Sequence, residues 1–182
     1  MKPSEHPEFF RFPAPEGRSR ESTIALDADC HFFHDGAPVE HDKLAAAMHS
    51  WISRHPDDDR FILTNGYDWT YFMVEDAPYV VRSIRVTDDS VMLLLSDGTE
   101  EAWDVSNTRI AESGAIYTQI KREKKPGTYE AKFSRHAQLS LAPYLETSSS
   151  TNETRGEAAA EPIQISKPLQ IRLKNRQFVI PA

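Results

Sequence analysis

The sequence predicts an α+β protein in which antiparallel sheets pack around one main helix. Asx-Gly dipeptides at 35–36, 65–66 and 97–98 are each flanked by short runs of strand-forming residues, a pattern typical of tight hairpins. One stretch, 41–54, has a helical apolar period instead. No regular alternation of strands and helices indicates a parallel sheet, so hairpins and one dominant helix define the expected architecture.

The composition favours an ordinary folded domain. The chain has 182 residues, of which 39% are hydrophobic and 27% charged, and this is enough apolar material for one core. No apolar run approaches the roughly 20 residues that a bilayer-spanning helix needs, so we expect no membrane partner. The start lacks the basic and apolar regions of a signal peptide, and we therefore expect a cytoplasmic location. The single cysteine, Cys30, excludes an intrachain disulfide and a multi-thiolate metal site.

The N-terminal segment, 1–22, is predicted to be a proline-rich arm. Phe9, Phe10 and Phe12 indicate that this arm packs locally instead of remaining fully solvated. The segment 27–39 then predicts a short hairpin, because its Asp-Gly dipeptide tolerates the positive φ of a tight turn.

The strongest helical signal covers 41–54. Its apolar residues are spaced i, i+4, i+7 and i+8, and Pro56 ends it. A second helix is predicted over 134–145, although Pro143 weakens its last turn. The apolar stripe of the first helix consists of Leu44, Met48, Trp51 and Ile52.

Strands are predicted where runs of β-branched and aromatic residues are bounded by turn residues. The strand 69–74 has apolar residues on both faces, which indicates a central, buried position. Alternatively, one of its aromatic faces lines a pocket. The other predicted strands cover 61–64, 79–86, 91–95, 99–105, 116–121 and 128–133.

These elements predict one domain over 23–146, which is compatible with two pseudo-repeated halves, 23–87 and 88–146. Residues 147–162 contain almost no large apolar side chain, so we expect a flexible linker. The segment 163–182 alternates apolar and basic residues and has no acid, within a chain of net charge −7. It predicts a basic, strand-like tail that docks on the acidic body or adds a strand to a partner.

Charge and motif content exclude several classes of function. An acidic body repels duplex phosphates, so we expect no nucleic-acid partner. Neither a P-loop nor a G-x-G-x-x-G motif occurs, and no nucleophile elbow is present, so we expect no cofactor of these types. The basic run at 121–125 is expected to be a solvated loop.

Three segments resemble the bacterial family known as domain of unknown function 1285. Residues 31–39 match its aromatic-x-x-Gly-small-Pro-aliphatic segment, and 74–79, Val-Glu-Asp-Ala-Pro-Tyr, match its most specific motif. Residues 129–135 are similar to its C-terminal Glu-Ala-Arg-aliphatic-x-Arg segment, whereas 63–69 departs from its Thr-Pro-aliphatic-Glu pattern. The resemblance extends over 28–145. It implies an α+β fold with two related halves and no established activity.

The two best-matching segments supply the predicted ligand-binding residues, on the assumption that the halves form a groove. Arg135 would contact an anionic group, Glu75 or Asp76 would accept hydrogen bonds, and Tyr79 would supply an apolar wall. The adjacent carboxylates could instead act as acid and base, or only fix the turn before the next strand.

One cluster has residue types that suit a metal ion, namely His31, His34 and His41 with neighbouring acids. Residues 31 and 34 point to opposite faces of a strand, so joint coordination requires the turn to bend the chain. We expect these residues to belong to the hairpin and the helix start, with a metal site as the alternative.

The sequence therefore favours a non-enzymatic ligand-binding or regulatory and signalling module with an unidentified small ligand or protein partner. One alternative is a metal-dependent or carboxylate-based hydrolase. Another is an assembly adaptor that acts through its basic tail. The sequence leaves the oligomeric state and the identity of the ligand open.

Overall fold

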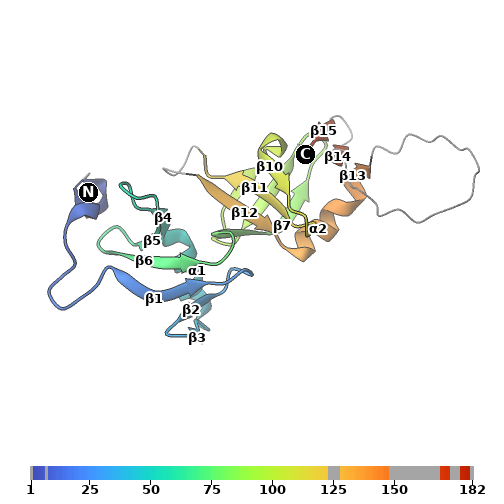
Figure 1. The fold of residues 1–182 in the computed structure, drawn as a ribbon. Helices are drawn as coiled ribbons and strands as arrows, with labels where there is room; N and C mark the ends of the chain where they lie inside the picture. Colours follow the sequence, from blue (N-terminus) through green and yellow to red (C-terminus); the bar gives the residue numbers. More distant parts are fainter. Residues whose placement is uncertain (1, 7, 123–127, 148–168, 173–176, 181–182) are drawn as a thin grey trace, which may run out of the picture.

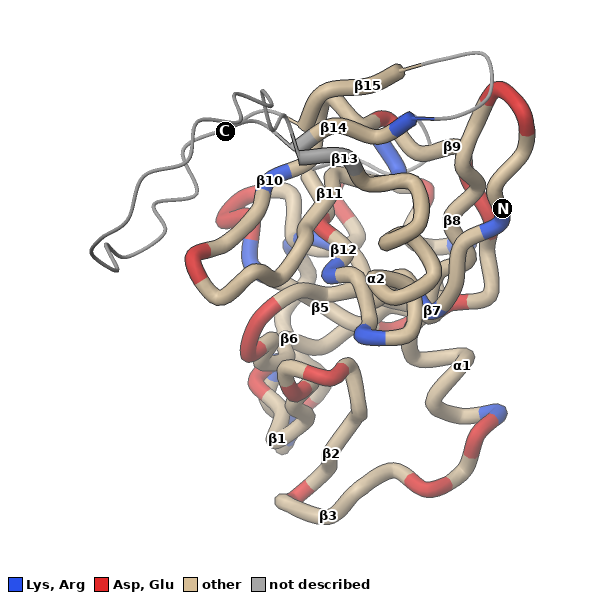
Figure 2. The backbone as a smooth tube through the Cα atoms, turned by 90° about the vertical axis from the view of Figure 1, so that its right-hand side faces the viewer, with Lys and Arg blue, Asp and Glu red and all other residues tan. Residues whose placement is uncertain are grey.

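The computed structural model describes residues 2–6, 8–122, 128–147, 169–172 and 177–180, and it contains two six-stranded sheets (Figure 1). The two sheets occupy opposite ends of the described body in both views (Figures 1 and 2). The predicted α+β class is confirmed. Within the described ranges, no helix is long and apolar enough to cross a bilayer.

The first sheet consists of two three-stranded antiparallel meanders. Its strands are β1 (Glu21–Leu26), β2 (Phe32–His34), β3 (Ala37–Pro38), β4 (Ile52–Arg54), β5 (Phe61–Thr64) and β6 (Trp69–Val74). Their spatial order is β3-β2-β1-β6-β5-β4, which places β1 and β6 at the centre. These two strands run parallel, with Leu26 opposite Val74. The predicted turns at 35–36 and 65–66 join β2 to β3 and β5 to β6.

The second sheet repeats this arrangement. Its strands are β7 (Tyr79–Val86), β8 (Val91–Leu95), β9 (Glu100–Ala102), β10 (Thr108–Ile110), β11 (Ile116–Ile120) and β12 (Tyr129–Phe133). The order β10-β11-β12-β7-β8-β9 again places the first and last strands side by side and parallel, with Tyr79 opposite Ala131. The sequence did not predict β10, and it predicted β9 longer than it is.

Both sheets are therefore mixed, with antiparallel meanders joined by one parallel pair. The sequence predicted only the antiparallel part, because a tight turn marks a hairpin locally whereas nothing local marks the pairing of β1 with β6. The sheets divide the chain between Val74 and Tyr79, earlier than the predicted boundary of the halves at 87–88. The repeated strand order is consistent with the predicted pseudo-repeat.

The two helices occupy different positions in the repeat. The helix α1 (Asp42–Trp51) lies between β3 and β4, and the Nδ1 atom of His41 caps it by accepting a hydrogen bond from Leu44 N at 3.2 Å. It ends before the predicted residue 54 because the chain enters β4 directly. The helix α2 (Arg135–Leu141) follows β12 and continues as the 3-10 turn η4 (Ala142–Tyr144), in agreement with the weakening effect of Pro143.

One continuous core joins the two sheets, and a smaller cluster lies beneath the N-terminal arm. The small cluster contains Phe9, Ile62 and Trp69. The strand β6 is central, as predicted, but Met73 is 65% exposed, so its two faces are not both buried. The largest fully buried side chains of the main core are Tyr79, Tyr129, Phe133, Leu26, Ile52, Leu93, Leu95, Ile120, Leu141, Ile171 and Ile180.

The two ends of the chain pack on different sheets. The arm forms the 3-10 turns η1 (Pro3–Glu5) and η2 (Phe9–Arg11) against the first sheet. The described part of the tail forms β14 (Leu169–Arg172) and β15 (Gln177–Val179) next to the second sheet (Figure 1). The strand β14 pairs with β13 (Leu145–Thr147) on one side and with β15 on the other. The predicted linker lies outside the described residues except for its first residue, Thr147.

Candidate functional site

The parallel pairing of β7 with β12 brings together the two segments that were predicted to form a ligand groove. The Oδ2 atom of Asp76 accepts hydrogen bonds from Lys132 Nζ at 2.8 Å and from the hydroxyl of Tyr117 at 3.0 Å. Lys132 Nζ also donates to the carbonyl oxygen of Ala28, at 3.3 Å. The hydrogen bond that Lys132 donates to Asp76 raises the pKa of Lys132, so the ammonium form is favoured. These groups thus join the second sheet to the β1–β2 turn of the first.

The same turn engages the other residues of the loop before β7. The Oε2 atom of Glu75 accepts a hydrogen bond from the amide of Ala28 at 3.1 Å. The thiol of Cys30 donates to the carbonyl oxygen of Ala77 at 3.3 Å. Burial raises the pKa of Cys30 to about 12, so this thiol stays protonated and is a poor nucleophile. The loop therefore has a structural role in connecting the sheets.

Tyr79 and Arg135 lie in different environments. Tyr79 is fully buried with its ring edge-on to Tyr129 at 6.0 Å, which leaves no surface for a ligand. Arg135 is exposed at the start of α2 and lines a pocket of about 380 Å³ that contains neither Glu75 nor Asp76. The role of Arg135 in ligand binding stays a prediction. The other lining residues of this pocket are Ile110, Gly114, Ile116, Gln138, Leu139 and Leu145.

The three histidines of the alternative metal site make separate contacts. His31 lies 3.4 Å from Asp27, His34 lies 3.8 Å from Asp35, and His41 caps α1. Within the part of the chain that the structure describes, no three metal-ligating side chains gather at one point. The hairpin and the helix start account for all three residues.

A buried ion pair lies in the second sheet, at a position that the sequence assigned to a solvated basic run. Lys121 Nζ is 2.7 Å from Asp97 Oδ2, and both side chains are only 4% exposed. The ammonium also donates to Thr99 Oγ1 at 2.8 Å and lies 5.0 Å from the ring centre of Tyr79. Burial alone would raise the pKa of Asp97, but hydrogen bonds from Lys121 and Thr99 lower it further than burial raises it. The prediction of a solvated Lys121 was therefore wrong, because its ammonium pairs with Asp97 and Thr99 in the interior.

An apolar pocket of about 340 Å³ lies between α1 and the first sheet. The helix contributes Leu44, Met48 and Trp51, which are members of the predicted apolar stripe. Met48 is buried whereas Leu44 is 43% exposed, so the stripe extends from the core to the mouth of the pocket. The remaining lining residues are Ile24, His34, Val39, Leu63, Asn65, Asp68, Trp69 and Thr70.

Two of the few polar groups that line this pocket, Asn65 and Asp68, lie where β5 turns into β6. Asp68 Oδ1 accepts hydrogen bonds from Arg20 Nη1 at 2.6 Å and from Trp69 N at 2.9 Å. Burial opposes the charged form of Asp68, but the hydrogen bonds from Arg20 and Trp69 lower its pKa by more, so it is ionised. Asn65 Oδ1 accepts from the amides of Tyr67 and Asp68, which fixes the β5–β6 turn at the rim. The lining is therefore mostly apolar, and its polar side chains are His34, Asn65, Asp68 and Thr70.

The sequence predicts the elements that form this pocket, but it does not predict that they form a site. The stripe 44–52 was predicted as a helix face, and a pocket beside strand 69–74 was the alternative to core packing. What was missing is the close approach of α1 to the β5–β6 turn, which depends on tertiary packing. In the structure, the partial exposure of Leu44 shows that the sheet covers the apolar face of α1 incompletely.

The fold and this pocket define the class of the protein: an α+β protein of two repeated six-stranded sheets with an apolar pocket beside its first helix. Its structure matches those of two DUF1285 family proteins. The protein from Silicibacter pomeroyi DSS-3 matches with a TM-score of 0.61 and 14% identity, over 94% of this chain and 91% of that one. The protein from Shewanella baltica OS155 matches with a TM-score of 0.54 and 16% identity, over 69% and 94%.

The resemblance predicted from the sequence is thus confirmed as a structural match over most of the chain. No family model and no curated protein matches the sequence itself. At these identities the match establishes the fold, and the function has to be argued from the site.

Proposed function

We propose that this protein is a non-enzymatic ligand-binding module of a regulatory or signalling kind, and that its ligand is a small amphipathic molecule. The observation that carries this proposal is the pocket between α1 and the first sheet. Its volume of about 340 Å³ falls within the range of small-molecule sites, and its lining is mostly apolar with a few polar groups. A ligand with an apolar body inside the pocket and a polar end beside Asn65 and Asp68 would match both the apolar and the polar part of the lining.

The predicted enzymatic alternatives have less support. Catalysis by adjacent carboxylates requires a free acid or base near a bound substrate. Glu75 and Asp76 instead hold Ala28, Lys132 and Tyr117 within the protein. The adaptor alternative requires a tail strand that pairs with a partner, but β14 of the tail already pairs with β13 of its own chain and with β15.

Binding of N-phenyl-1-naphthylamine, an uncharged fluorescent probe, to the full chain tests this proposal. We expect saturable one-to-one binding, because the probe is apolar like the lining of the pocket. Since the probe is uncharged, the test does not depend on the charge of the natural ligand. Leu44→Trp fills the mouth of the pocket, and we expect it to weaken binding ~10-fold or more. Lys43→Ala is the matched control, since residue 43 is exposed on the same helix and does not line the pocket.

Two results would contradict the proposal. One is equal affinity of the wild type and Leu44→Trp, with both proteins folded. The other is saturable binding that Leu139→Ala weakens and Leu44→Trp does not, because Leu139 lines the second pocket. Native mass spectrometry of the untagged protein from cell extract would then identify any retained ligand.

The second pocket is the second candidate site. Arg135 gives it a positive group, and the exposed Leu139 and Ile110 give it apolar walls. An anionic ligand would satisfy this combination. Arg135→Ala is expected to weaken binding of an anionic probe such as 1-anilinonaphthalene-8-sulfonate without changing the thermal unfolding midpoint. An unchanged affinity for the probe would show that Arg135 does not contribute to binding it.

A further inference from the structure

The pocket between α1 and the first sheet has one carboxylate among its described lining residues, and no lysine or arginine. The carboxylate belongs to Asp68, at the start of β6, and this side chain is 58% exposed. The other polar side chains of the lining are those of His34, Asn65 and Thr70. Asp68 is therefore the group that decides which charge is favoured at the polar end of a bound ligand.

Within the described part of the chain, Asp68 uses only one of its two carboxylate oxygens. Oδ1 accepts hydrogen bonds from Arg20 Nη1 at 2.6 Å and from Trp69 N at 2.9 Å. Burial opposes the charged form, but these two hydrogen bonds lower the pKa of Asp68 by more. Lys2 lies against Gly66 in the same turn and forms no ion pair with Asp68. The oxygen Oδ2 is therefore a charged acceptor that a ligand can use.

The guanidinium group that pairs with Asp68 lies on the other face of the sheet. Arg20 packs 4.4 Å from the ring centre of Trp69, which clusters with Ile62 beneath the N-terminal arm. Ile62 and the pocket-lining Leu63 are adjacent in β5, so they point to opposite faces. Arg20 itself is not among the lining residues. A ligand in the pocket thus meets the carboxylate of this ion pair and not its guanidinium.

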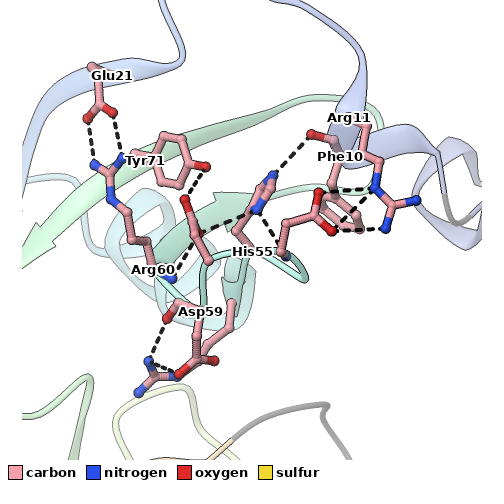
Figure 3. Close-up of polar contacts among 10 residues, drawn as sticks. Phe10, Arg11, Glu21, His55, Asp59, Arg60 and Tyr71 are labelled. Carbon is pink, nitrogen blue, oxygen red and sulfur yellow. Dashed lines mark hydrogen bonds and ion pairs between the residues drawn. The ribbon is translucent and has the colours of Figure 1, made fainter.

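The N-terminal arm closes that other face (Figure 3). The carbonyl oxygen of Phe10 lies 3.1 Å from His55 Nε2. Arg11 donates to the Asp57 carboxylate through Nε at 3.0 Å and through Nη2 at 2.9 Å. Beside these contacts the side chain of Arg20 is only 18% exposed. The arm therefore helps to keep the positive partner of Asp68 away from the pocket.

The chain around the mouth of the pocket adds negative charge (Figure 2). Asp35 and Glu40 each directly follow a residue that lines the pocket, and Asp42 is the first residue of α1. Lys43 is the only lysine or arginine between residues 35 and 51. Three acids against one base give this side a negative potential, which attracts a cation to the mouth and repels an anion.

We propose that the ligand of this pocket is an amine with an apolar body, whose ammonium group donates a hydrogen bond to Asp68 Oδ2. This inference rests on the proposed function, because it names the chemical class of the ligand for the same pocket. The apolar body lies against Leu44 and Met48, as the lining requires. An anionic amphiphile such as a fatty acid is disfavoured, because its carboxylate would face Asp68 with no basic residue of the described lining to pair with.

Displacement of N-phenyl-1-naphthylamine from the full chain tests the class of ligand. Octylamine, octanol and nonanoate carry the same straight hydrocarbon chain and differ in the charge of the polar end. We expect octylamine to displace the probe at a concentration ~5-fold lower than octanol, because both partners of its hydrogen bond are charged. We expect nonanoate to be the weakest of the three.

Asp68→Asn removes the charge while keeping a side-chain oxygen that can accept from Arg20 and from the amide of Trp69. We expect octylamine to lose its advantage, so that the ratio of its affinity to that of octanol falls to about one. Glu112→Gln is the matched control. It removes one negative charge from an exposed position between β10 and β11 of the second sheet, and should keep the ratio of the wild type.

Two results would overturn this inference and leave the proposed function intact. One is that octanol or nonanoate displaces the probe as well as octylamine does, while Leu44→Trp weakens the binding of all three. The other is a folded Asp68→Asn variant that keeps the wild-type preference, since another group would then select the amine. If the wild type shows no saturable binding of the fluorescent probe, the proposed function is wrong and this inference with it.

Salt gives a second readout that needs no variant, so the inference stays testable if Asp68→Asn does not fold. Raising the sodium chloride concentration from about 0.05 M to about 0.5 M screens exposed and half-exposed charges. We expect the affinity of the wild type for octylamine to fall several-fold, and that for octanol to change little. An equal response of the two compounds to salt would overturn the inference.

Discussion

In the first sheet the ion pairs between elements lie at the surface, whereas in the second sheet a lysine and an aspartate pair in the interior. Arg60 and Glu21 meet with side chains that are 51% and 61% exposed. Lys121 and Asp97 meet at 4% exposure for both. The second sheet has exposed pairs too, such as Arg109 with Glu130, so what distinguishes it from the first is its additional buried pair. Water screens the surface contacts of both sheets, while the buried pair of the second depends on complete pairing of charges that have lost their hydration.

The largest expected effect comes from removing one partner of the buried pair. Asp97→Ala leaves the ammonium of Lys121 without its counter-charge, and we expect a loss of ~3–5 kcal/mol in the free energy of unfolding by urea titration. The double variant Asp97→Leu/Lys121→Met removes both charges and is expected to recover most of that loss. A single variant as stable as the wild type would mean that water reaches this pair.

The second-largest expected effect is a loss of stability at acid pH, through protonation of His49. This side chain of α1 is 2% exposed and lies 4.8 Å from the ring of Phe32. Burial and the positive charge of Arg82 lower its pKa from 6.5 to about 4, against a smaller opposite effect of Asp97. Since the unfolded chain takes up the proton first, stability is complete above pH 6.5 and falls as the pH drops toward 4.

This loss is expected to be on the order of 2–3 kcal/mol. His49→Phe keeps an aromatic ring and cannot take up a proton. The free energy of unfolding of this variant, measured from pH 7 to 4, should therefore decrease less than that of the wild type. Parallel pH profiles for the two proteins would show that His49 does not carry the effect.

A smaller effect is expected where the two sheets meet. Asp76→Asn weakens the contacts of this side chain with Lys132 and Tyr117, which are only partly shielded from water. We expect a loss of ~1 kcal/mol in the free energy of unfolding, because hydrogen bonds to a charged group at intermediate exposure have about this value. Amide exchange in the β1–β2 turn should also accelerate, since Lys132 holds Ala28 there. Unchanged exchange in that turn would show that the sheets are joined by apolar packing alone.

The smallest effect is expected in the first sheet at Glu21. Glu21→Gln removes the charge from a solvated pair with Arg60, and we expect no measurable change in the unfolding midpoint by differential scanning calorimetry. A clear shift would mean that the surface pairs of the first sheet stabilise it as the interior pair stabilises the second.

Local chemistry explains what the sequence predicted well. The Asx-Gly turns, the helix stripe and the proline after α2 each act within a few residues, so both helices and most strands beside the Asx-Gly turns were predicted from short windows. The strands β1, β4 and β10 were not predicted. The parallel pairs were missed because β1 meets β6 and β7 meets β12 across long stretches of chain. The burial of Lys121 was missed for the same reason, since its partner Asp97 belongs to a different hairpin.

The candidate site was harder to predict than the fold. Leu44, Met48 and Trp51 were predicted as one face of a helix, but a helix face does not specify how completely a sheet covers it. The family resemblance pointed to 74–79 and 129–135. The structure shows that these segments meet and that Asp76 and Lys132 hold the sheets together there. The segments that best match the family motifs thus form the junction between the sheets. The pocket depends instead on how α1 packs on the first sheet, which no motif indicates.

The parallel central pairs have a consequence for how the chain folds during synthesis. In each sheet, the strand that is synthesised first pairs with the strand that is synthesised last, because β1 neighbours β6 and β7 neighbours β12. One edge of the first strand therefore stays unpaired until the last strand has been made. On the ribosome the first sheet can close once Val74 has left the exit tunnel, without any residue of the second sheet. The second sheet must likewise wait for Phe133. Each sheet is therefore expected to form in a single late step during translation, with its unpaired central edge exposed to chaperones until then.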